Sequence, residues 1–394
     1  MEKSNSQRLL SLDVLRGFTI AGMMLVNNPG SWSHVYAPLG HAQWNGLTLS
    51  DLVFPFFIFI MGCSMYFSFK KFDFRFSSDA FWKLTRRSVL LFAIGLALAW
   101  LSLSMRTFNS AEATSLSFFE RLYFATTNFE HLRILGVLQR LALVSFFGTL
   151  LILLIRPKFI PYIIALILII YWLIIHMTNS YEMNEQSIVA VVDRAILGIN
   201  HMYYDTTLTG ERIAFDPEGI LSTLPSIAHV LVGFWAGKII SDNKDLTFKI
   251  QGLFIFGTIL LFLGFLFEYG FGLNKKIWSS TFVLVTSGLA AQFLALLLWI
   301  IDGKGHKKWA SFFESFGVNP MIIFVFGSAS SILISNIGFQ YNGVFTSIKS
   351  FLYHHMMQPH LGDYFGSFVF AVAFMFVCWV FGNMLYKRKI FIKL

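Results

Sequence analysis

The sequence predicts an all-α integral membrane protein, a helical bundle with about ten transmembrane helices. Hydrophobic residues make up 56% of the 394 residues and charged residues only 13%. The mean hydropathy is +0.65, far above that of a soluble domain. Apolar runs long enough to cross a bilayer of roughly 30 Å recur along the chain. They lie at 9–28, 48–69, 88–105, 134–155, 159–177, 219–240, 250–270, 279–301, 317–338 and 364–386.

The ten runs follow one another without a soluble domain or a low-complexity linker. Residues 1–394 are therefore predicted to form a single membrane domain, with longer outer loops near 106–133, 178–218 and 339–363. Asp13 and Arg16 interrupt the first run, and no small-residue cleavage site follows it. We expect this run to remain as a helix, because it lacks the features of a cleavable signal peptide.

The distribution of Lys and Arg predicts that both chain ends face the cytoplasm. Twenty of the 30 lie in segments that would then be cytoplasmic and eight in outer segments, while Arg16 and Arg140 lie within predicted spans. The net charge of +9 is therefore mainly a topology signal, and no nucleic-acid-binding motif accompanies it. Eight of the ten histidines fall on the outer side, together with eleven Asp and Glu residues that suit a polar or cationic substrate.

The segment HAQWNGLTLSDLVFPFFIFIMG, residues 41–62, places a histidine and a carboxylate at the threshold of an apolar span. Ionisable groups there are costly and usually functional. Asp51 could fix the tautomer of His41 and stabilise its protonated form. His41 could then deprotonate an amine or hydroxyl, or attack an acyl group itself. Asn45 adds a further polar group to this segment, and Trp44 and Asn45 are candidates for substrate binding. The alternative is an interfacial histidine bonded to backbone, with Trp44 as an aromatic anchor.

The first span, SLDVLRGFTIAGMMLVNN, carries three polar residues of interest. Asp13 and Arg16 are three residues apart, so they share a helix face near the cytoplasmic end. They could bind a ligand, or form a neutralising pair that orients the helix. Asn27 comes at the outer end of the same helix. Its amide could hold a carbonyl oxygen as negative charge develops, or merely cap the helix.

Two later blocks add further candidates for substrate binding. LRILGVLQRLALV buries Gln139 and Arg140 among apolar residues, which is costly unless both face a polar interior. FDPEGILSTLPS places Asp216 and Glu218 just before a helix, whose first turn they would favour electrostatically even without a ligand.

Two motifs contribute polar groups at span edges that are weak signals individually. LNKKIWSS supplies Asn274, Lys275, Trp278 and Ser279, and FGVNP supplies Asn319 and Pro320. Of these, Trp278 is a candidate for substrate binding. No zinc-ligand spacing, nucleotide-binding loop or GxSxG motif is present, so no metal and no permanently bound cofactor are expected.

Together these blocks resemble the heparan-α-glucosaminide N-acetyltransferase family, a branch of the transmembrane acyltransferases. The likeness covers nearly the whole chain, through SLDVLRG, HAQWNGLTLSDLVFPFFIFIMG, LRILGVLQRL, FDPEGILSTLPSIAHVLVGFWAGK, NKKIWSS, FGVNP and LYKRKIFIKL. It implies that His41 is catalytic, with Asn27 and Asp51 as its amide and carboxylate. The related acyltransferase-3 family has an arginine followed after ten residues by a histidine. Here Asn27 stands in that place after Arg16, which argues against acyl transfer to a hydroxyl by simple analogy.

The resemblance also implies that acetyl-CoA arrives from the cytoplasm and that an amino sugar is acetylated on the far side. The expected contacts for the CoA nucleotide are basic residues of the inner face, each of which also fits a plain topology role: Arg86, Arg87, Lys387, Arg388 and Lys389. Because no sizeable soluble domain precedes the first span, the chain is expected to resemble the bacterial members. It would then lie among the lipids of a bacterial inner membrane, where its apolar surface allows a homodimer.

Two other functions fit the same composition. Ten helices and acidic outer loops also suit a transporter of amino sugars or peptidoglycan fragments. A third reading is an O-acyltransferase that modifies a surface polysaccharide. Uptake of sugar without acetyl-CoA would distinguish the first of these from acetyl transfer, and an ester product labile to mild base would distinguish the second.

Overall fold

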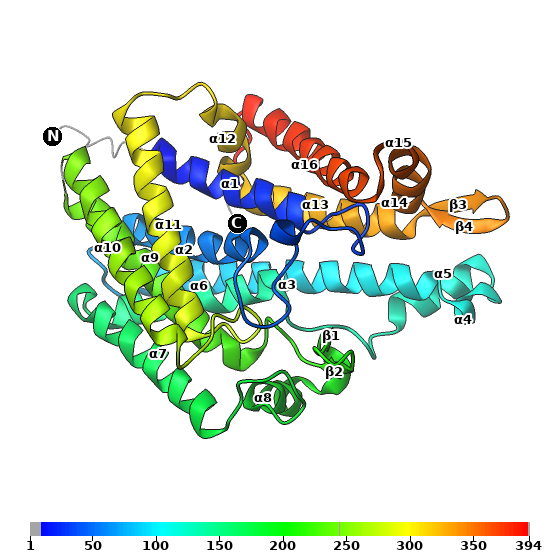
Figure 1. Ribbon diagram of the computed structural model, residues 1–394, viewed down its shortest axis with the longest axis horizontal. Coiled ribbons are helices and arrows are strands. Elements are labelled where there is room, and N and C mark those ends of the chain that lie inside the picture. Colours follow the sequence, from blue (N-terminus) through cyan, green and yellow to red (C-terminus); the bar gives the residue numbers. More distant parts are fainter. Residues whose placement is uncertain (1–8, 244, 393–394) are drawn as a thin grey trace.

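The computed structural model describes residues 9–243 and 245–392, and it confirms a nearly all-α protein (Figure 1). The long helices are α1 (Leu10–Val26), α2 (Leu49–Lys70), α3 (Ser78–Phe108), α6 (Val137–Leu154), α7 (Ile160–Met177), α9 (Ile220–Asp242), α10 (Leu246–Glu268), α11 (Ser280–Leu297), α13 (Pro320–Asn336) and α16 (Asp363–Lys387). Within the described ranges, eight helices are long and apolar enough to cross a membrane, and α12 with α13 makes a ninth if this bent pair is one span. The chain is a multi-pass membrane protein.

Short elements fill the segments between the long helices. The helices are α4 (Ala111–Thr114), α5 (Phe118–Thr127), α8 (Ile188–Leu197), α12 (Ala310–Val318), α14 (Ile348–Phe351) and α15 (Gln358–Leu361). Two antiparallel hairpins join β1 (Tyr204–Thr206) to β2 (Arg212–Ala214) and β3 (Gly338–Tyr341) to β4 (Val344–Ser347). Asp205 lies opposite Ile213 in the first, and Phe339 lies opposite Thr346 in the second. Helices α4, α5, α14 and α15 and the β3–β4 hairpin project from one end of the molecule (Figure 1).

Two of the expected spans differ from the helices that form. The span predicted at 88–105 lies in the C-terminal two-thirds of α3, which begins ten residues earlier at Ser78. The span predicted at 317–338 forms as α13, but its first two residues belong to α12, which meets α13 at an angle of 85°. Pro320 begins α13 and has no N–H to continue the hydrogen bonds of α12, and it disfavours helical geometry at Asn319.

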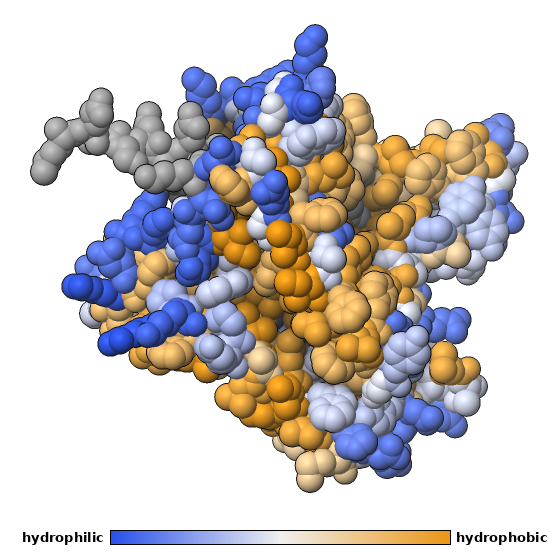
Figure 2. All heavy atoms as spheres, turned by 60° about the vertical axis from the view of Figure 1, so that its left-hand side comes forward, coloured by the Kyte–Doolittle hydropathy of each residue, from blue (hydrophilic) through white to orange (hydrophobic). Residues whose placement is uncertain are grey.

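The surface of the protein has large exposed apolar areas, as expected for a protein that lies in a membrane. Figure 2 shows a broad hydrophobic surface bordered on two sides by hydrophilic residues. Many large apolar side chains are exposed on α7 and α10, among them Tyr162, Ile169, Phe254 and Phe262. Such faces are stable in contact with lipid and would be costly in water.

Helices α2 and α9 form a close crossing that sets the position of the candidate site. A Cβ atom at Gly62 would lie 2.0 Å from the carbonyl oxygen of Val230, and one at Gly233 would lie 2.0 Å from that of Phe59. Only glycine allows the two backbones to approach this closely, as in many membrane helix pairs. The contact fixes the start of α2, which carries Asp51, relative to the start of α9.

Candidate functional site

His41 and Asp51 lie together, as the sequence predicted for a paired imidazole and carboxylate. His41 Nδ1 is 2.8 Å from Asp51 Oδ1. The Asp51 side chain is 1% exposed, whereas that of His41 is 39% exposed. The carboxylate is therefore buried behind the ring, and the ring remains accessible from outside the protein.

The two oxygens of Asp51 have different partners. Oδ2 accepts hydrogen bonds from the backbone N–H groups of Ala42 and Thr48, at 3.0 and 3.2 Å. It also lies 3.0 Å from the Thr48 hydroxyl. These bonds cap the start of α2 in a capping box with Thr48. Oδ1 is left to face His41. Asp51 thus has two roles, because one oxygen caps the helix and the other orients the imidazole.

Lys275, from the loop between α10 and α11, completes this group. Its Nζ is 3.2 Å from Asp51 Oδ1 and 3.1 Å from His41 Nδ1. A bare Nδ1 lone pair would repel the carboxylate at 2.8 Å, so Nδ1 carries the proton and donates it to Asp51. Lys275 then bonds to Asp51, and the Nε2 lone pair of His41 is free. Burial lowers the pKa of Lys275, and the charge of Asp51 partly offsets that effect.

The loop that holds His41 is joined to the loop that holds Lys275. Asn45 and Asn274 form an antiparallel backbone bridge, and the Asn274 amide donates to Asn45 Oδ1 at 3.3 Å. Gly46 N donates to Leu273 O at 2.8 Å. Asn45, a candidate for substrate binding, thus has an amide oxygen engaged in fixing the two loops. The arrangement places Lys275 beside His41 from a position 234 residues away.

Trp44, another candidate for substrate binding, is largely buried among the outer loops. Its ring is 7% exposed and packs edge-on against Phe215. Its Nε1 donates to the carbonyl oxygen of Tyr181 at 2.8 Å. The ring therefore packs within the protein and leaves little surface for a ligand in this conformation.

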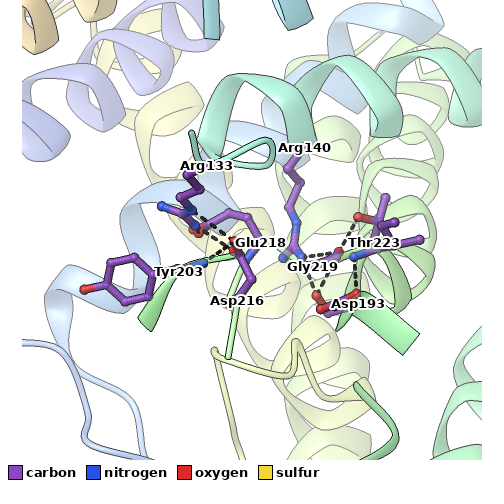
Figure 3. A network of polar contacts seen from close by, with 10 residues as sticks. Arg133, Arg140, Asp193, Tyr203, Asp216, Glu218, Gly219 and Thr223 are labelled. Carbon is purple, nitrogen blue, oxygen red and sulfur yellow. Dashed lines mark hydrogen bonds and ion pairs between the residues drawn. The ribbon is translucent and has the colours of Figure 1, made fainter. Parts of the chain in front are cut away.

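Asp216 and Glu218 are brought together by Arg133 in a buried ion network (Figure 3). Arg133 makes two hydrogen bonds to Asp216, at 3.0 and 2.6 Å, and one to Glu218 at 2.5 Å. Asp216 also accepts from the backbone N–H groups of Tyr203 and Glu218. Burial opposes ionisation of Glu218, but Arg133 and Arg140 outweigh it and hold the pKa of Glu218 below its usual range. These contacts anchor the segment that precedes α9.

Asp193, on α8, caps the start of α9 (Figure 3). Its Oδ1 accepts from Ile220 N at 2.7 Å and from Leu221 N at 3.4 Å, while no described atom bonds to Oδ2. A Cβ atom at Gly219 would collide with that second oxygen. Burial raises the pKa of Asp193 to about 6, although the backbone bonds oppose the shift. The sequence did not single out Asp193, because it lies in a helix too short to read as a span.

Gln139 and Arg140 are both buried on α6 and contact different neighbours. Gln139 packs against Gly95 of α3. Arg140 donates to Gly219 O at 3.0 Å and to the Ser222 hydroxyl, and it lies 5.1 Å above the ring of Trp278. Trp278, at 1% exposure, packs against Phe54 of α2. None of Gln139, Arg140 and Trp278 bonds to His41 in the described part of the chain, so their role with a ligand stays a prediction.

A cavity of about 1030 Å³ lies between α1, α2, α3, α6 and the start of α13. Asp13 and Arg16 line it and pair at 3.1 Å, and Arg16 also donates to Ser64 at 2.6 Å. Helix α2 contributes one face, from Phe69 to Phe57. Phe57 is six residues beyond Asp51, or about 9 Å along the helix axis. The charged residues of the wall are Asp13, Arg16, Asp79, Lys83 and Arg87.

The remaining candidates have no hydrogen bond or ion pair to His41, Asp51 or Lys275 within the described ranges. Asn27 ends α1 with an exposed side chain that makes no hydrogen bond to a described residue. Of the expected CoA contacts, Arg87 lines the cavity. Arg86, Lys387, Arg388 and Lys389 are exposed and are not part of its wall. In the described ranges, no cluster of His, Cys, Asp and Glu could hold a metal ion.

The comparisons with known proteins point to one enzyme. The chain is 28% identical over 380 residues to the heparan-alpha-glucosaminide N-acetyltransferase of Mus musculus, an alignment that covers 82% of this chain and 54% of that protein. It is 29% identical over 370 residues to the protein of the same name from Homo sapiens, covering 81% of this chain and 52% of that one. The chain thus spans about half the length of these curated relatives. No family model matches.

Proposed function

We propose that this chain, a relative of the heparan-alpha-glucosaminide N-acetyltransferases, is a transmembrane enzyme that transfers acetyl from acetyl-CoA to the amine of glucosamine or a glucosamine-containing saccharide. The observation that carries this proposal is the His41 group, in which an accessible imidazole is backed by a buried carboxylate at 2.8 Å. An imidazole held in this way has a free Nε2, which is the atom that acyl transfer requires.

In direct transfer, His41 acts as a general base on the amine. The amine nitrogen attacks the thioester carbonyl, and Nε2 takes a proton from it as the new C–N bond forms. The C–S bond then breaks, and the imidazolium returns its proton to the CoA sulfur. The products are the N-acetyl sugar and free CoA. Asp51 stabilises the transient imidazolium through Nδ1, and Lys275 compensates the buried charge of Asp51 between turnovers.

A second route uses His41 as the nucleophile. Nε2 attacks the thioester carbonyl, and CoA leaves as a thiolate when the C–S bond breaks. The amine then attacks the acetyl carbon, the bond from that carbon to Nε2 breaks, and the proton lost by the amine balances the one taken up by the thiolate. Both routes need the same tautomer. An acetylated enzyme trapped with labelled acetyl-CoA in the absence of sugar, and absent in His41→Ala, would favour the second route.

Asn27 is proposed to polarise the thioester carbonyl. In the structure its side chain is exposed and makes no hydrogen bond to a described residue, so it is available to a ligand. An amide that contacts the carbonyl oxygen only as charge develops would lower kcat when it is removed, with little effect on KM.

The large cavity is proposed to hold acetyl-CoA. Arg16, Lys83 and Arg87 give its wall a basic character that suits phosphate groups. Phe54, Phe57 and Met61 lie on one face of α2. Phe54, which comes between Asp51 and the cavity-lining Phe57 along the helix, packs against Trp278. The acetyl end of the bound molecule would pass this point to reach His41. In this arrangement the nucleotide enters from the cytoplasmic side and the sugar from the opposite side, as the charge distribution favours.

Purified protein in liposomes, supplied with acetyl-CoA and glucosamine, tests the proposal. We expect N-acetylglucosamine and free CoA in equal amounts, with acetyl-CoA needed on the side of the basic loops. No turnover across several amino sugars would contradict the proposal. Uptake of labelled sugar without acetyl-CoA would favour a transporter, and a product labile to mild base would favour O-acylation.

A further inference from the structure

Lys275 has contacts that the catalytic scheme does not by itself require. The scheme needs a carboxylate behind the imidazole, and Asp51 alone supplies one. The structure adds a lysine whose Nζ lies 3.2 Å from Asp51 Oδ1 and 3.1 Å from His41 Nδ1. Two groups that can carry positive charge thus face one buried carboxylate.

The position of Lys275 is fixed by its own loop. Asn274 Oδ1 accepts from Ile277 N at 3.1 Å, and Asn274 N donates to the Ser279 hydroxyl at 3.0 Å. Trp278 N donates to the carbonyl oxygen of Lys275 at 3.1 Å. The side chain is 20% exposed. Lys275 is therefore held against His41 by a closed turn, unlike a lysine that extends into solvent.

The charged groups around this lysine come from three elements. Asp51 belongs to α2, His41 to the loop before it, and Glu218 to the segment before α9, from which its charge acts on Lys275. The carboxylate of Asp51 can be compensated by an ammonium or by an imidazolium. Compensation by both at once would place two positive charges about 3 Å apart, which is unfavourable. A charged Lys275 therefore favours the neutral form of His41.

We propose that Lys275 is a positioning residue that keeps His41 unprotonated beside an ionised Asp51, and so extends acetyl transfer to lower pH. This inference rests on the proposed function for its effect on catalysis. Its effect on the protonation of His41 does not depend on acetyl transfer. Without the ammonium, the imidazole would take up a proton to compensate Asp51, and its Nε2 would lose the lone pair that the reaction uses.

Lys276 provides a matched control in the same turn. Its Nζ pairs with Asp205 at 2.7 Å, and its side chain is 18% exposed, close to the 20% of Lys275. It makes no hydrogen bond to His41 or Asp51 in the described part of the chain. Replacing either lysine by methionine removes one positive charge from the same loop, but only Lys275→Met removes it from the His41 group.

The test follows carbethoxylation of His41 by diethyl pyrocarbonate, which reacts with neutral imidazole. Mass spectrometry of the peptide that contains residue 41 gives the rate against pH. In Lys275→Met we expect the pH of half-maximal rate to rise by about one unit, a tenfold change in proton binding. Lys276→Met and Lys275→Arg should match the wild type. Lys275→Gln, which keeps a donor without the charge, should behave like Lys275→Met and replaces it if the methionine variant does not elute as a single species.

The acid limb of the acetyl-transfer rate should move in parallel, by the same interval and in the same variants. The inference would be overturned if the pH of half-maximal carbethoxylation were the same in the wild type, Lys275→Met and Lys275→Gln. If no variant and no wild type transfers acetyl, the proposed function fails, while the carbethoxylation profile still decides the role of Lys275.

Discussion

Replacing Asp51 by asparagine preserves the shape of the side chain and removes its charge, and we expect it to remove most of the acetyl transfer. The structure indicates how the new amide would orient. Oδ2 accepts from two backbone N–H groups, of Ala42 and Thr48. An NH₂ group in that position would face two donors and leave them unpaired. The new amide should therefore keep its oxygen there and turn its NH₂ group toward His41.

That orientation reverses the tautomer of His41. An NH₂ donor facing Nδ1 requires a lone pair on Nδ1, so the proton moves to Nε2, which can then accept neither a proton nor an acetyl group. In a serine protease triad the corresponding change costs about 10⁴ in kcat, equivalent to about 5.5 kcal/mol of transition-state stabilisation. We expect kcat to fall by about 10³- to 10⁴-fold. The KM for acetyl-CoA should change little, because Asp51 does not line the cavity.

The assay is the steady-state rate of N-acetylglucosamine formation in liposomes, with acetyl-CoA binding measured separately. Thr48→Val is the control, because it removes the hydroxyl that lies 3.0 Å from Asp51 Oδ2 and keeps the contact with His41. It should cost about 1 kcal/mol of stability and leave kcat within a few fold. A rate for Asp51→Asn within tenfold of the wild type would refute the tautomer argument.

Three further changes test other parts of the structure. Arg133→Met removes the ion-pair partner of the buried Asp216 and the half-buried Glu218, so thermal unfolding in detergent should show a loss of about 3–5 kcal/mol. An unchanged melting temperature would contradict the network. Asp193 has a folded pKa of about 6 against 3.8 unfolded, so its contribution to stability is greatest below pH 4 and falls by about 3 kcal/mol as pH rises through 6. Asp193→Asn should abolish this dependence of stability on pH. If the pH profile of unfolding is the same in the variant as in the wild type, Asp193 is not its source. Arg87→Glu should weaken acetyl-CoA binding about tenfold or more, whereas Arg86→Glu, outside the cavity wall, should not; equal effects would place the nucleotide elsewhere.

The helices and the pairing of His41 with Asp51 could be predicted from the sequence, because both depend on local patterns. Apolar runs of span length fix the helices. Asp51 is ten residues from His41, and the start of a helix brings a first-turn carboxylate back toward the preceding loop. The dual role of Asp51 could not be read from that spacing, since capping and catalysis use the same residue type.

Lys275 could not be identified in the same way. A lysine at the edge of a span has the pattern of a topology residue, and only the bridge between Asn45 and Asn274 brings it to His41. The first ten residues of α3, 78–87, were not part of the span expected at 88–105, because they too contain charged residues. Lys83 and Arg87 lower the hydropathy of that segment, yet they line a cavity that only the folded bundle creates.

The bend at Asn319 and the network of Arg133 also depend on contacts distant in sequence. Asn319 holds the chain near its C-terminal end, donating to Ile390 O at 2.7 Å and accepting from Ile392 N at 2.9 Å. In the sequence, Arg133 has the pattern of an ordinary charged residue in an outer loop. Its partner Asp216 is 83 residues away, and only the fold brings the two together.

The most direct measurement compares wild type with His41→Ala in matched liposomes supplied with acetyl-CoA and glucosamine. General base catalysis by a positioned side chain contributes about 10²–10⁴-fold, so we predict that the variant loses at least about a hundredfold in turnover. It should bind acetyl-CoA with the affinity of the wild type, since His41 is not part of the cavity wall. Turnover by His41→Ala at the wild-type rate would show that the chemistry occurs elsewhere.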